Sequence, residues 1–462
     1  MILKIRTTLT GMLVGGAAIC IGIMSAEAIP GDGAAGGHST GADVAVCDMP
    51  SIYRWGTVSG VTAYSVATTS VNFGDVNLEW TANNNRHPRI PQNIYRCLDG
   101  RLTQLGMSWC KDGFCALQNS GCAPGCSGGG GCPQYLTPGC ADPYSDSLNG
   151  SQSGLGPRHQ CNAHTGWFQY PTQGMPGAGG TLGRRVNVFM DDLTPSLNPG
   201  AMYFTEAKYL HAQDTEADNH DNNASYKRCT VGSLSSSGYR LTPSGSTRVG
   251  EAGIFAWDEC SDTVQIETLD FDNEGRVFIG SDVIDNGDGT YRYEYAVYNL
   301  NSHHNVGVFE VPVPSGVTVT DIGFDDVHHH SGEPIDSDDW VSFDSGGYIS
   351  WQCPAYNPSN DDENAIRWNT MYNFWFTANA APQESMGYVE AHKAGDFYGV
   401  DVVAPGGPAN PYDLNQDGCV DGGDLGIFLA LWGGSAGDFN GDGVTNGADQ
   451  GLLLAAWEVK CP

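Results

Sequence analysis

Two twelve-residue loops near the C-terminus constrain the fold of this chain more than any other feature. Residues 413–424 read DLNQDGCVDGGD and residues 438–449 read DFNGDGVTNGAD. Each loop places oxygen-bearing side chains at positions 1, 3, 5, 9 and 12 and a glycine at position 6. Ca²⁺ prefers about six to eight oxygen ligands, and this spacing lets one loop surround one ion. The tandem loops therefore predict two bound calcium ions.

The predicted ligands come from six positions of each loop. Position 7 contributes only its backbone carbonyl oxygen, so the residue type there is unrestricted. Gly418 and Gly443, at position 6, provide the sharp turn that brings the two ends of each loop to the same ion. The predicted ligands are Asp413, Asn415, Asp417, Cys419, Asp421, Asp424, Asp438, Asn440, Asp442, Val444, Asn446 and Asp449.

An apolar helix is expected after each loop and not before it. Leu425, Phe428, Leu429 and Trp432 fall at i, i+3, i+4 and i+7, which is one face of a helix. Pro411 and the Gly/Ser run at 433–437 interrupt the chain before the loops. A calcium loop with only its exit helix, present twice, resembles the type I dockerin repeat of secreted polysaccharide-degrading bacteria.

The dockerin resemblance implies a cohesin-like or cell-surface partner that binds the C-terminal repeats. In dockerins, loop positions 10 and 11 carry much of the cohesin contact. Here those positions are Gly422–Gly423 and Gly447–Ala448, which offer almost no side chain. The repeats are also offset by only 25 residues, Asp438 against Asp413. These departures favour calcium binding over cohesin recognition.

Residues 1–28 have the pattern of an export signal. Lys4 and Arg6 precede an apolar run from Met12 to Met24, and Ala26–Ala28 forms a small-residue cleavage site. The run is too short for a convincing membrane span, and no other stretch approaches that length. The sequence therefore predicts a secreted or cell-surface protein without a membrane span, in which residues 29–46 form a flexible leader.

The cysteines fit an exported protein. Fifteen are present, and fourteen remain when Cys20 of the leader is set aside. We expect a disulfide-stapled insertion at 97–161, with a zinc site as the alternative. Its cysteines are Cys97, Cys110, Cys115, Cys122, Cys126, Cys132, Cys140 and Cys161.

Cys419 and Cys461 are the only cysteines beyond Cys353. A duplicated loop–helix unit packs with approximate two-fold symmetry, which brings the first loop near the end of the second helix. We expect these two cysteines to pair with one another, the alternative being that each pairs with the body or stays free.

Composition limits the classes of partner and the number of domains. The formal net charge of −32 excludes nucleic acid as a natural partner, because phosphates would be repelled. About 430 residues remain after the signal, more than one hydrophobic core normally serves. We expect a β-rich domain at 47–250, a β-sandwich at 251–404, a linker at 405–412 and the helical calcium-binding domain at 413–462.

The fold class is predicted to be mainly β, with one or two antiparallel β-sandwiches. Residues 285–289 read DNGDG, a hairpin turn between two strands. Residues 366–376 alternate between an apolar face and a mostly polar face that carries Trp375. The Ser/Gly-rich stretch at 232–246 is interpreted as a domain boundary.

The body of the chain resembles an uncharacterised family of exported bacterial proteins that carry dockerin-like repeats. The resemblance rests on residues 92–96, 142–144, 222–226 and 365–368. It implies no activity that can be transferred to particular residues.

Three further groups are candidate sites. His328–His330, flanked by Asp325, Asp326 and Glu333, could ligate a transition metal, although a structural loop is the simpler interpretation. His211, Asp214, Asp218, His220 and Asp221 form a second cluster, interpreted as a solvated loop, with weak cation binding as the alternative. Trp375 beside Arg367, Asn369 and Asn373 could form a sugar-binding surface, although a tryptophan on such a face more often packs under a neighbouring loop.

The sequence leaves three functions open. The first is a calcium-binding surface or matrix component, whose β-sandwich body has a structural or binding role. The second is a carbohydrate-binding or polysaccharide-degrading component of a dockerin system, and any enzymatic activity would be that of a glycoside hydrolase. The third is a metalloenzyme that uses the histidine loops. We recognise no catalytic motif in the body.

Overall fold

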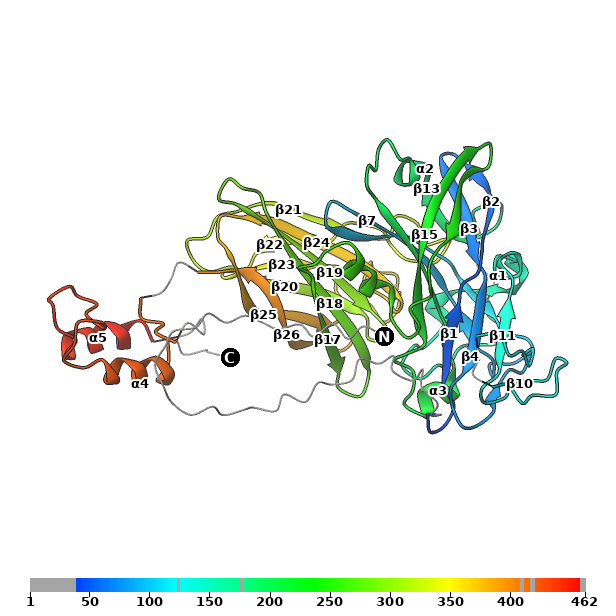
Figure 1. Ribbon diagram of the computed structural model, residues 1–462, viewed down its shortest axis with the longest axis horizontal. Coiled ribbons are helices and arrows are strands. Elements are labelled where there is room, and N and C mark those ends of the chain that lie inside the picture. Colours follow the sequence, from blue (N-terminus) through cyan, green and yellow to red (C-terminus); the bar gives the residue numbers. More distant parts are fainter. Residues whose placement is uncertain (1–38, 123–124, 174–177, 408–410, 416–419, 458–462) are drawn as a thin grey trace.

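The computed structural model describes residues 39–122, 125–173, 178–407, 411–415 and 420–457. The predicted signal peptide and most of the predicted leader lie outside these residues. The described chain is mainly β, and its sheets are antiparallel (Figure 1). Within this part of the chain, no helix combines the length and apolar character needed to cross a bilayer.

Two five-stranded sheets pack face to face between residues 265 and 405. The first has the order β17 (Gln265–Phe271), β18 (Gly275–Asp285), β19 (Tyr291–Asn299), β24 (Thr370–Ala378), β21 (Val319–Asp325). The second has the order β22 (Val341–Asp344), β23 (Tyr348–Gln352), β20 (Val306–Pro312), β25 (Pro382–Ala391), β26 (Asp396–Pro405). The predicted hairpin turn is confirmed, because Asp285 of β18 pairs with Tyr291 of β19.

Aromatic side chains fill the space between these two sheets. Phe374 of β24 contacts Phe309 of β20 and Trp351 of β23, with ring centroids 5.2 and 5.4 Å apart. Phe376 lies next to Tyr295 in the same core. The apolar face predicted for this strand is therefore confirmed from residue 372 to 376, and the two sheets form a sandwich around one core.

The N-terminal part of the body is built on a third five-stranded sheet, which smaller sheets surround. Its order is β16 (Gly238–Pro243), β15 (Ala224–Ser235), β14 (Met202–Lys208), β7 (Gln92–Leu98), β8 (Arg101–Met107). One three-stranded sheet contains β1 (Val44–Asp48), β4 (Thr68–Asn72) and β11 (Ala141–Tyr144), and a second contains β2 (Ile52–Val58), β3 (Val61–Val66) and β13 (Val186–Phe189). A third contains β6 (Arg89–Ile90), β9 (Cys110–Asp112) and β12 (Leu155–Gly156). A two-stranded sheet contains β5 (Leu78–Glu79) and β10 (Tyr135–Leu136).

Helical turns in the body are short. They are α1 (Asp146–Asn149), α2 (Met190–Leu193) and α3 (Ala212–Glu216), with 3₁₀ turns η2 (Gln152–Gly154), η3 (Arg158–Gln160) and η4 (Gly253–Glu259). The stretch 232–246, interpreted above as a boundary, instead contains the hairpin of β15 and β16, with Ser235 paired to Gly238. That interpretation is wrong because serine and glycine here serve a tight turn inside a sheet.

The polar face of β24 does not meet solvent. It packs against β8 of the N-terminal sheet, where Asn373 donates a hydrogen bond to the Leu102 carbonyl and Gln104 accepts one from the Met371 backbone. The Arg101 guanidinium lies 3.7 Å from the Trp375 ring centroid. Asn369, Asn373 and Arg367 are buried, so the sugar-binding surface expected around Trp375 is absent. The contact between the N-terminal sheet and the β17–β18–β19–β24–β21 sheet of the sandwich, which includes β8 and β24, is called the seam below.

A fully buried carboxylate lies at the seam. Glu206 of β14 accepts hydrogen bonds from five donors on both sides. Its Oε2 accepts from Asn93, Tyr95 and Asn369, and its Oε1 accepts from Tyr298 and the Gly253 backbone, at 2.6–3.1 Å. Buried charge is tolerated only when it is hydrogen-bonded in this way. The network therefore fixes the two β units against each other.

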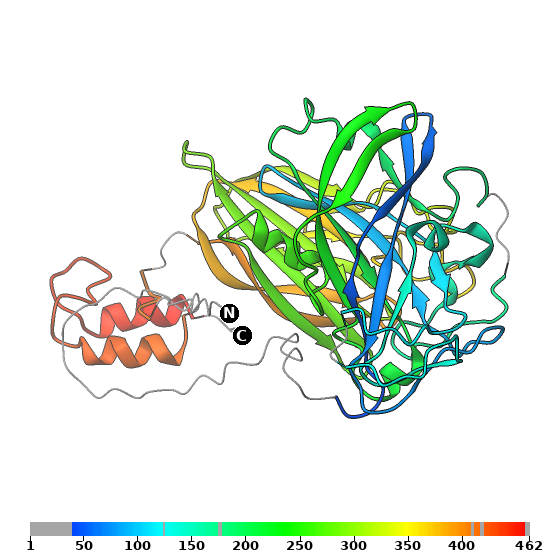
Figure 2. The ribbon, with the colours of Figure 1, turned by 45° about the vertical axis from the view of Figure 1, so that its right-hand side comes forward.

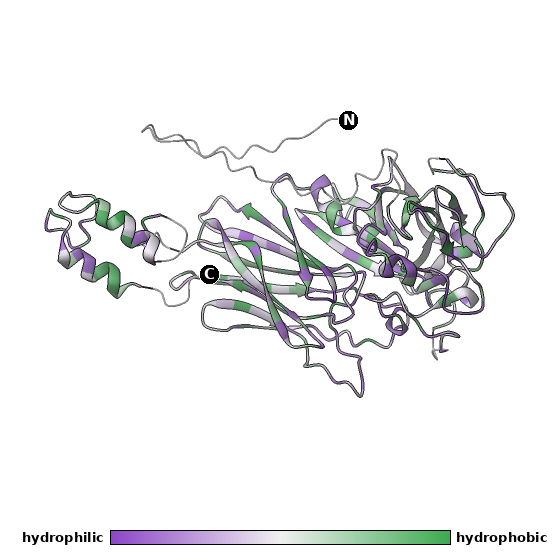
Figure 3. Ribbon diagram, turned by 90° about the horizontal axis from the view of Figure 1, so that it is seen from below, coloured by the Kyte–Doolittle hydropathy of each residue, from purple (hydrophilic) through white to green (hydrophobic). Residues whose placement is uncertain are grey.

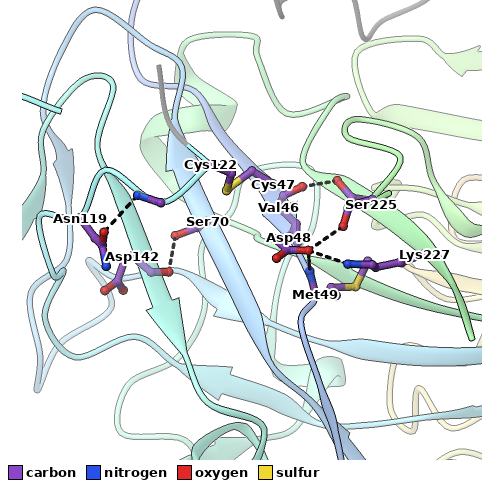
Figure 4. The surroundings of a disulfide bond; sticks show 12 residues. Val46, Cys47, Asp48, Met49, Ser70, Asn119, Cys122, Asp142, Ser225 and Lys227 are labelled. Atoms are coloured by element: carbon purple, nitrogen blue, oxygen red, sulfur yellow. Dashed lines mark hydrogen bonds and ion pairs between the residues drawn. A yellow bond between two sulfur atoms is a disulfide. The ribbon is translucent and has the colours of Figure 1, made fainter. Parts of the chain in front are cut away.

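Four disulfides connect the N-terminal half of the body: Cys47–Cys122, Cys97–Cys260, Cys115–Cys132 and Cys126–Cys140. Figure 4 shows the first, close to the ion pair between Asp48 and Lys227. Six of the eight cysteines between 97 and 161 are bonded, in line with the disulfide interpretation. Two of these bonds leave the segment, however, so it is stapled to β1 and to η4 rather than closed on itself.

Candidate calcium site

The C-terminal tail contains two helices that lie side by side (Figure 2). They are α4 (Gly422–Ala430) and α5 (Gly447–Ala455), and each begins at position 10 of a predicted calcium loop. The expected exit helices are thus present. Val420, Phe428 and Leu453 are the fully buried apolar residues between them. This core is small, so the helices need the loops to hold them together.

Each loop ends in the same reciprocal cap. Asp421 and Asn446, at position 9, accept hydrogen bonds from the backbone of their own helices, and the aspartates at position 12 bond back to the backbone of position 9. These two aspartates, Asp424 and Asp449, are fully buried. The reciprocal bonds form a capping box, which fixes where each helix starts.

The position-12 aspartates also close the loops. Oδ1 of Asp424 accepts from the backbone of Leu414 and Asn415, at positions 2 and 3 of the first loop. Oδ1 of Asp449 accepts from the backbone of Phe439 and Asn440, the same positions of the second loop. The two loops therefore share one hydrogen-bond pattern, 25 residues apart.

Asp438 organises the beginning of the second loop. Its carboxylate accepts hydrogen bonds from the backbone of Gly441, Asp442 and Gly443, at 2.6–3.0 Å. Gly441 and Gly443 have φ values of +76° and +96°, where glycine avoids the steric cost of a Cβ. The loop thus turns around the position-1 carboxylate.

The centre of the second loop gathers acceptor atoms. Nδ2 of Asn440 lies 3.0 Å from Asp442 Oδ2, and Nδ2 of Asn446 lies 3.3 Å from the same oxygen. Nδ2 of Asn446 also lies 2.8 Å from the Val444 carbonyl. The NH₂ groups of the two asparagines therefore donate hydrogen bonds to the Asp442 carboxylate and the Val444 carbonyl, the same oxygens that would coordinate a calcium ion. The residues present fit calcium, because both asparagines also carry amide oxygens.

The first loop is described only in part. Asp413, Asn415, Asp421 and Asp424 are among the described residues, whereas Asp417 and Cys419 are not. The expected Cys419–Cys461 disulfide also lies outside them and stays a prediction. Across the described residues, no group of three or more His, Cys, Asp or Glu side chains is placed to hold a metal ion. The predicted calcium sets rely on asparagine and carbonyl oxygens in addition to acids.

Hydrogen bonding favours the charged form of two predicted ligands. Burial raises the pKa of Asp424, but backbone donors from Asp421, Asn415 and Leu414 outweigh it and the net pKa is lowered. The hydrogen bond from Asn440 likewise lowers the pKa of Asp442. Both carboxylates are therefore ionised at neutral pH, as cation binding requires.

The histidine loop lines a separate cavity of about 650 Å³. His328, His329 and His330 line it together with Asn187 and the glycine-rich segment 179–183. Burial lowers the pKa of His330 to about 4, and it also lowers that of His329. Both imidazoles are therefore neutral at physiological pH.

The polar atoms around this cavity are not all satisfied. Asn187 is 2% exposed and His330 is 8% exposed, yet Asn187 Oδ1 and His330 Nε2 have no hydrogen-bond partner among the described residues. Glu333 is already occupied, because it accepts from the Arg158 and His159 backbones. The cavity thus offers neutral hydrogen-bonding groups and no available carboxylate from Glu333.

The second histidine cluster differs from the solvated loop that its composition predicted. His211 and Asp214 are buried, and Asp214 accepts hydrogen bonds from the Val44 backbone and from Asn223. Long-range packing of β1 against this loop covers it, and no local signal in the sequence marks that contact.

Lys208 is a buried residue that sequence reasoning missed. It is fully buried on β14, and its Nζ has no hydrogen-bond partner among the described residues. Burial lowers its pKa to about 8. The sequence offers one indication of its burial: Lys208 follows Glu206 by two residues and so lies on the same face of β14.

Comparison with known proteins does not assign the chain to a family. No protein-family model matches it, and no curated protein sequence matches it. Among solved structures it is similar to a serine-rich repeat protein from Streptococcus agalactiae, with 9% sequence identity over 81% of this chain and 97% of that chain. The TM-score is 0.19, which is too low to carry an argument about fold or function.

Proposed function

We propose that this chain is an exported calcium-binding protein in which the tail takes up two Ca²⁺ ions and the β body serves as a surface or matrix component. The observation that carries the proposal is the shared hydrogen-bond pattern of the two loops around Asp424 and Asp449. Ion binding that stabilises the loops also stabilises the helices that follow them.

The body supports an extracellular role. The described residues contain four disulfides, and disulfides persist in oxidising compartments. They agree with export by the predicted signal at residues 1–28. A rigid, cross-linked β body without a recognised catalytic motif fits a structural or binding component.

The tail also presents apolar side chains that a partner would cover. Figure 3 shows apolar stretches along both helices of the tail. The exposed ones include Ile427, Leu429 and Leu454 on the helices and Trp432 and Trp457 just beyond them. Exposed apolar patches of this kind mark interaction surfaces. The tail would therefore attach the body to a cohesin-like or other cell-surface partner.

Calcium titration of Asp442→Asn tests the proposal. Asparagine retains an oxygen that can accept the hydrogen bond from the Val444 backbone, so the turn is preserved while one charge is lost. Calcium affinity of the second loop should fall by roughly tenfold or more, because loop affinity depends on ligand charge. The matched control is Asp288→Asn in the hairpin 285–289, whose carboxylate accepts from Thr290. Equal calcium binding in both variants would refute the assignment.

Carbohydrate binding is the second candidate, and the histidine-lined cavity is the observation that favours it. A polyol carries donors and acceptors without charge, which suits Asn187 Oδ1 and the neutral imidazole of His330. Calorimetric titration of the full chain with soluble polysaccharides should show binding that His329→Ala weakens. His304→Ala, a histidine outside the cavity lining, is the control. Absence of heat with every polysaccharide class would remove this candidate.

A further inference from the structure

Four buried cysteines of the described body lie outside the four disulfides, and two of them, Cys110 and Cys161, pack together. Cys110 is the first residue of β9 and Cys161 directly follows η3. They are 0% and 2% exposed, and both belong to one small apolar cluster. The other members of that cluster are Ala163, Phe168, Leu210 and Trp368.

The fold brings the two cysteines into one cluster. Gly156 of β12 pairs with Cys110 of β9, which holds the start of the segment that leads to Cys161 beside Cys110. Both side chains pack in the same small buried cluster, in which the Cys161 thiol donates a hydrogen bond to the Pro157 carbonyl. Two cysteines that share one buried cluster can be joined when their Cα atoms lie within roughly 7 Å of each other.

The charges around the pair distinguish its two members. Burial raises the pKa of Cys161, but the hydrogen bond from Cys110 and the positive charge of the Arg89 guanidinium outweigh it, so the net pKa is lowered. Burial raises the pKa of Cys110. In the packed segment Cys161 is therefore the more easily ionised of the two thiols.

We propose that Cys110 and Cys161 form a fifth disulfide when the exported chain folds, and that this bond fixes the segment 157–161 against β9. A zinc site is the competing use of two such thiols. It needs further ligands, and among the described residues no group of three metal-ligating side chains includes this pair.

The electrons pass to a disulfide-bonded oxidoreductase of the export compartment. The Cys161 thiolate attacks one sulfur of the oxidoreductase disulfide and displaces the other as a thiolate. Cys110 then loses its proton and attacks Cys161 Sγ, which releases the reduced oxidoreductase. Overall two thiols lose two protons and two electrons, and one disulfide of the oxidoreductase becomes a dithiol. Because both cysteines are buried in the folded protein, the exchange takes place before this segment packs. In that unpacked chain the pKa shifts of the cluster are absent, so Cys110 can make the first attack equally well, with the same overall balance.

The bond would secure a residue that joins the two β units. Arg158 donates hydrogen bonds to the carbonyls of Ser108 and Gln92 on one side of the seam and to the Asn369 carbonyl on the other. Its own backbone N–H donates to Glu333. A cross-link at Cys161, three residues away, limits the conformations that Arg158 can reach in the unfolded chain.

A peptide map without reductant tests the proposal on the full chain exported to an oxidising compartment. The protein is unfolded in guanidinium with iodoacetamide and then digested. We expect Cys110 and Cys161 to be joined, whereas Cys229 and Cys353, two buried free cysteines elsewhere in the body, should be alkylated. Alkylation of both Cys110 and Cys161, or a bond from either to another cysteine, would overturn the proposal.

A double-mutant cycle gives a second, energetic test. Cys110→Ala, Cys161→Ala and the double variant should each lower the folded-to-unfolded ratio by about 500-fold, because each removes the same cross-link. The loop that this cross-link closes is shortened to roughly 35 residues by the Cys115–Cys132 and Cys126–Cys140 disulfides inside it. The pair Cys110→Ala and Cys229→Ala is the control and should show additive losses. Additive losses for Cys110 and Cys161 would contradict the bond. If a variant does not fold, the peptide map alone decides.

Discussion

Replacing the buried carboxylate of Glu206 by an amide should uncouple the two β units. In Glu206→Gln, the new NH₂ group must face either the Gly253 backbone N–H or the Asn93 side chain. The Gly253 donor cannot turn away. Asn93 is also fixed, because its Oδ1 accepts a hydrogen bond from Arg158. Either orientation of the amide therefore places two donors against each other.

The magnitude follows from the bonds that change. One charge-assisted hydrogen bond is lost, which costs about 1.5–3 kcal/mol, and the remaining bonds to Glu206 become neutral and weaker. We expect a total loss of roughly 3–5 kcal/mol in the free energy of unfolding, similar to breaking other buried charge networks. Glu216→Gln, at an exposed glutamate of α3, is the control and should change it by less than about 0.5 kcal/mol.

Urea denaturation followed by tryptophan fluorescence measures this loss. Trp257 reports on the seam, because its indole N–H donates to the Gly100 carbonyl at the end of the β7–β8 hairpin. Glu206→Gln should lower the midpoint of the fluorescence transition. A midpoint that equals that of the Glu216→Gln control would refute the view that Glu206 holds the seam together.

Three further predictions concern buried charges and the tail. Lys208→Met should stabilise the protein by about 3 kcal/mol below pH 8, because the folded-state pKa is lowered to about 8; the gain should shrink as the pH rises above 8 and disappear by about pH 11, where wild-type Lys208 has lost its proton in both states, and a pH-independent gain would contradict it. Asp142→Asn should gain stability relative to the wild type, by an amount that grows to about 4 kcal/mol between pH 4 and 7. Burial raises the folded-state pKa of Asp142 to about 7, so over this range the carboxyl ionises in the unfolded state only and wild-type stability falls; a flat difference across that range would contradict it. The segment 405–462 should be largely unfolded in chelator and become helical with calcium, as measured by circular dichroism, and Asp413→Ala or Asp424→Ala should weaken the first loop while the second still binds.

Local sequence patterns predicted the elements of this structure well where each element follows its own periodicity. The alternation at 372–376 marked a strand with one core face, and the loop spacing marked where α4 and α5 begin. Both are properties of neighbouring residues: a strand repeats every two residues, and a cap fixes a helix at its first turn.

The seam could not be predicted in the same way. The polarity of Asn373 and Asn369 makes a solvent-facing sugar-binding surface one candidate, yet both residues are buried against β8 and Glu206. Their partners lie more than a hundred residues away in the sequence, so no local pattern identifies them. The same holds for Cys97, whose disulfide partner Cys260 lies outside the expected insertion.

Calcium stoichiometry is the most direct test of the proposed function. The full chain, freed of metal by a chelator and dialysed, is titrated with Ca²⁺ in an isothermal calorimeter. We predict two ions per chain, one ion in Asp438→Ala, and two in the Asp288→Ala control. A stoichiometry of zero, or two ions in Asp438→Ala, would contradict the assignment of the loops as calcium sites.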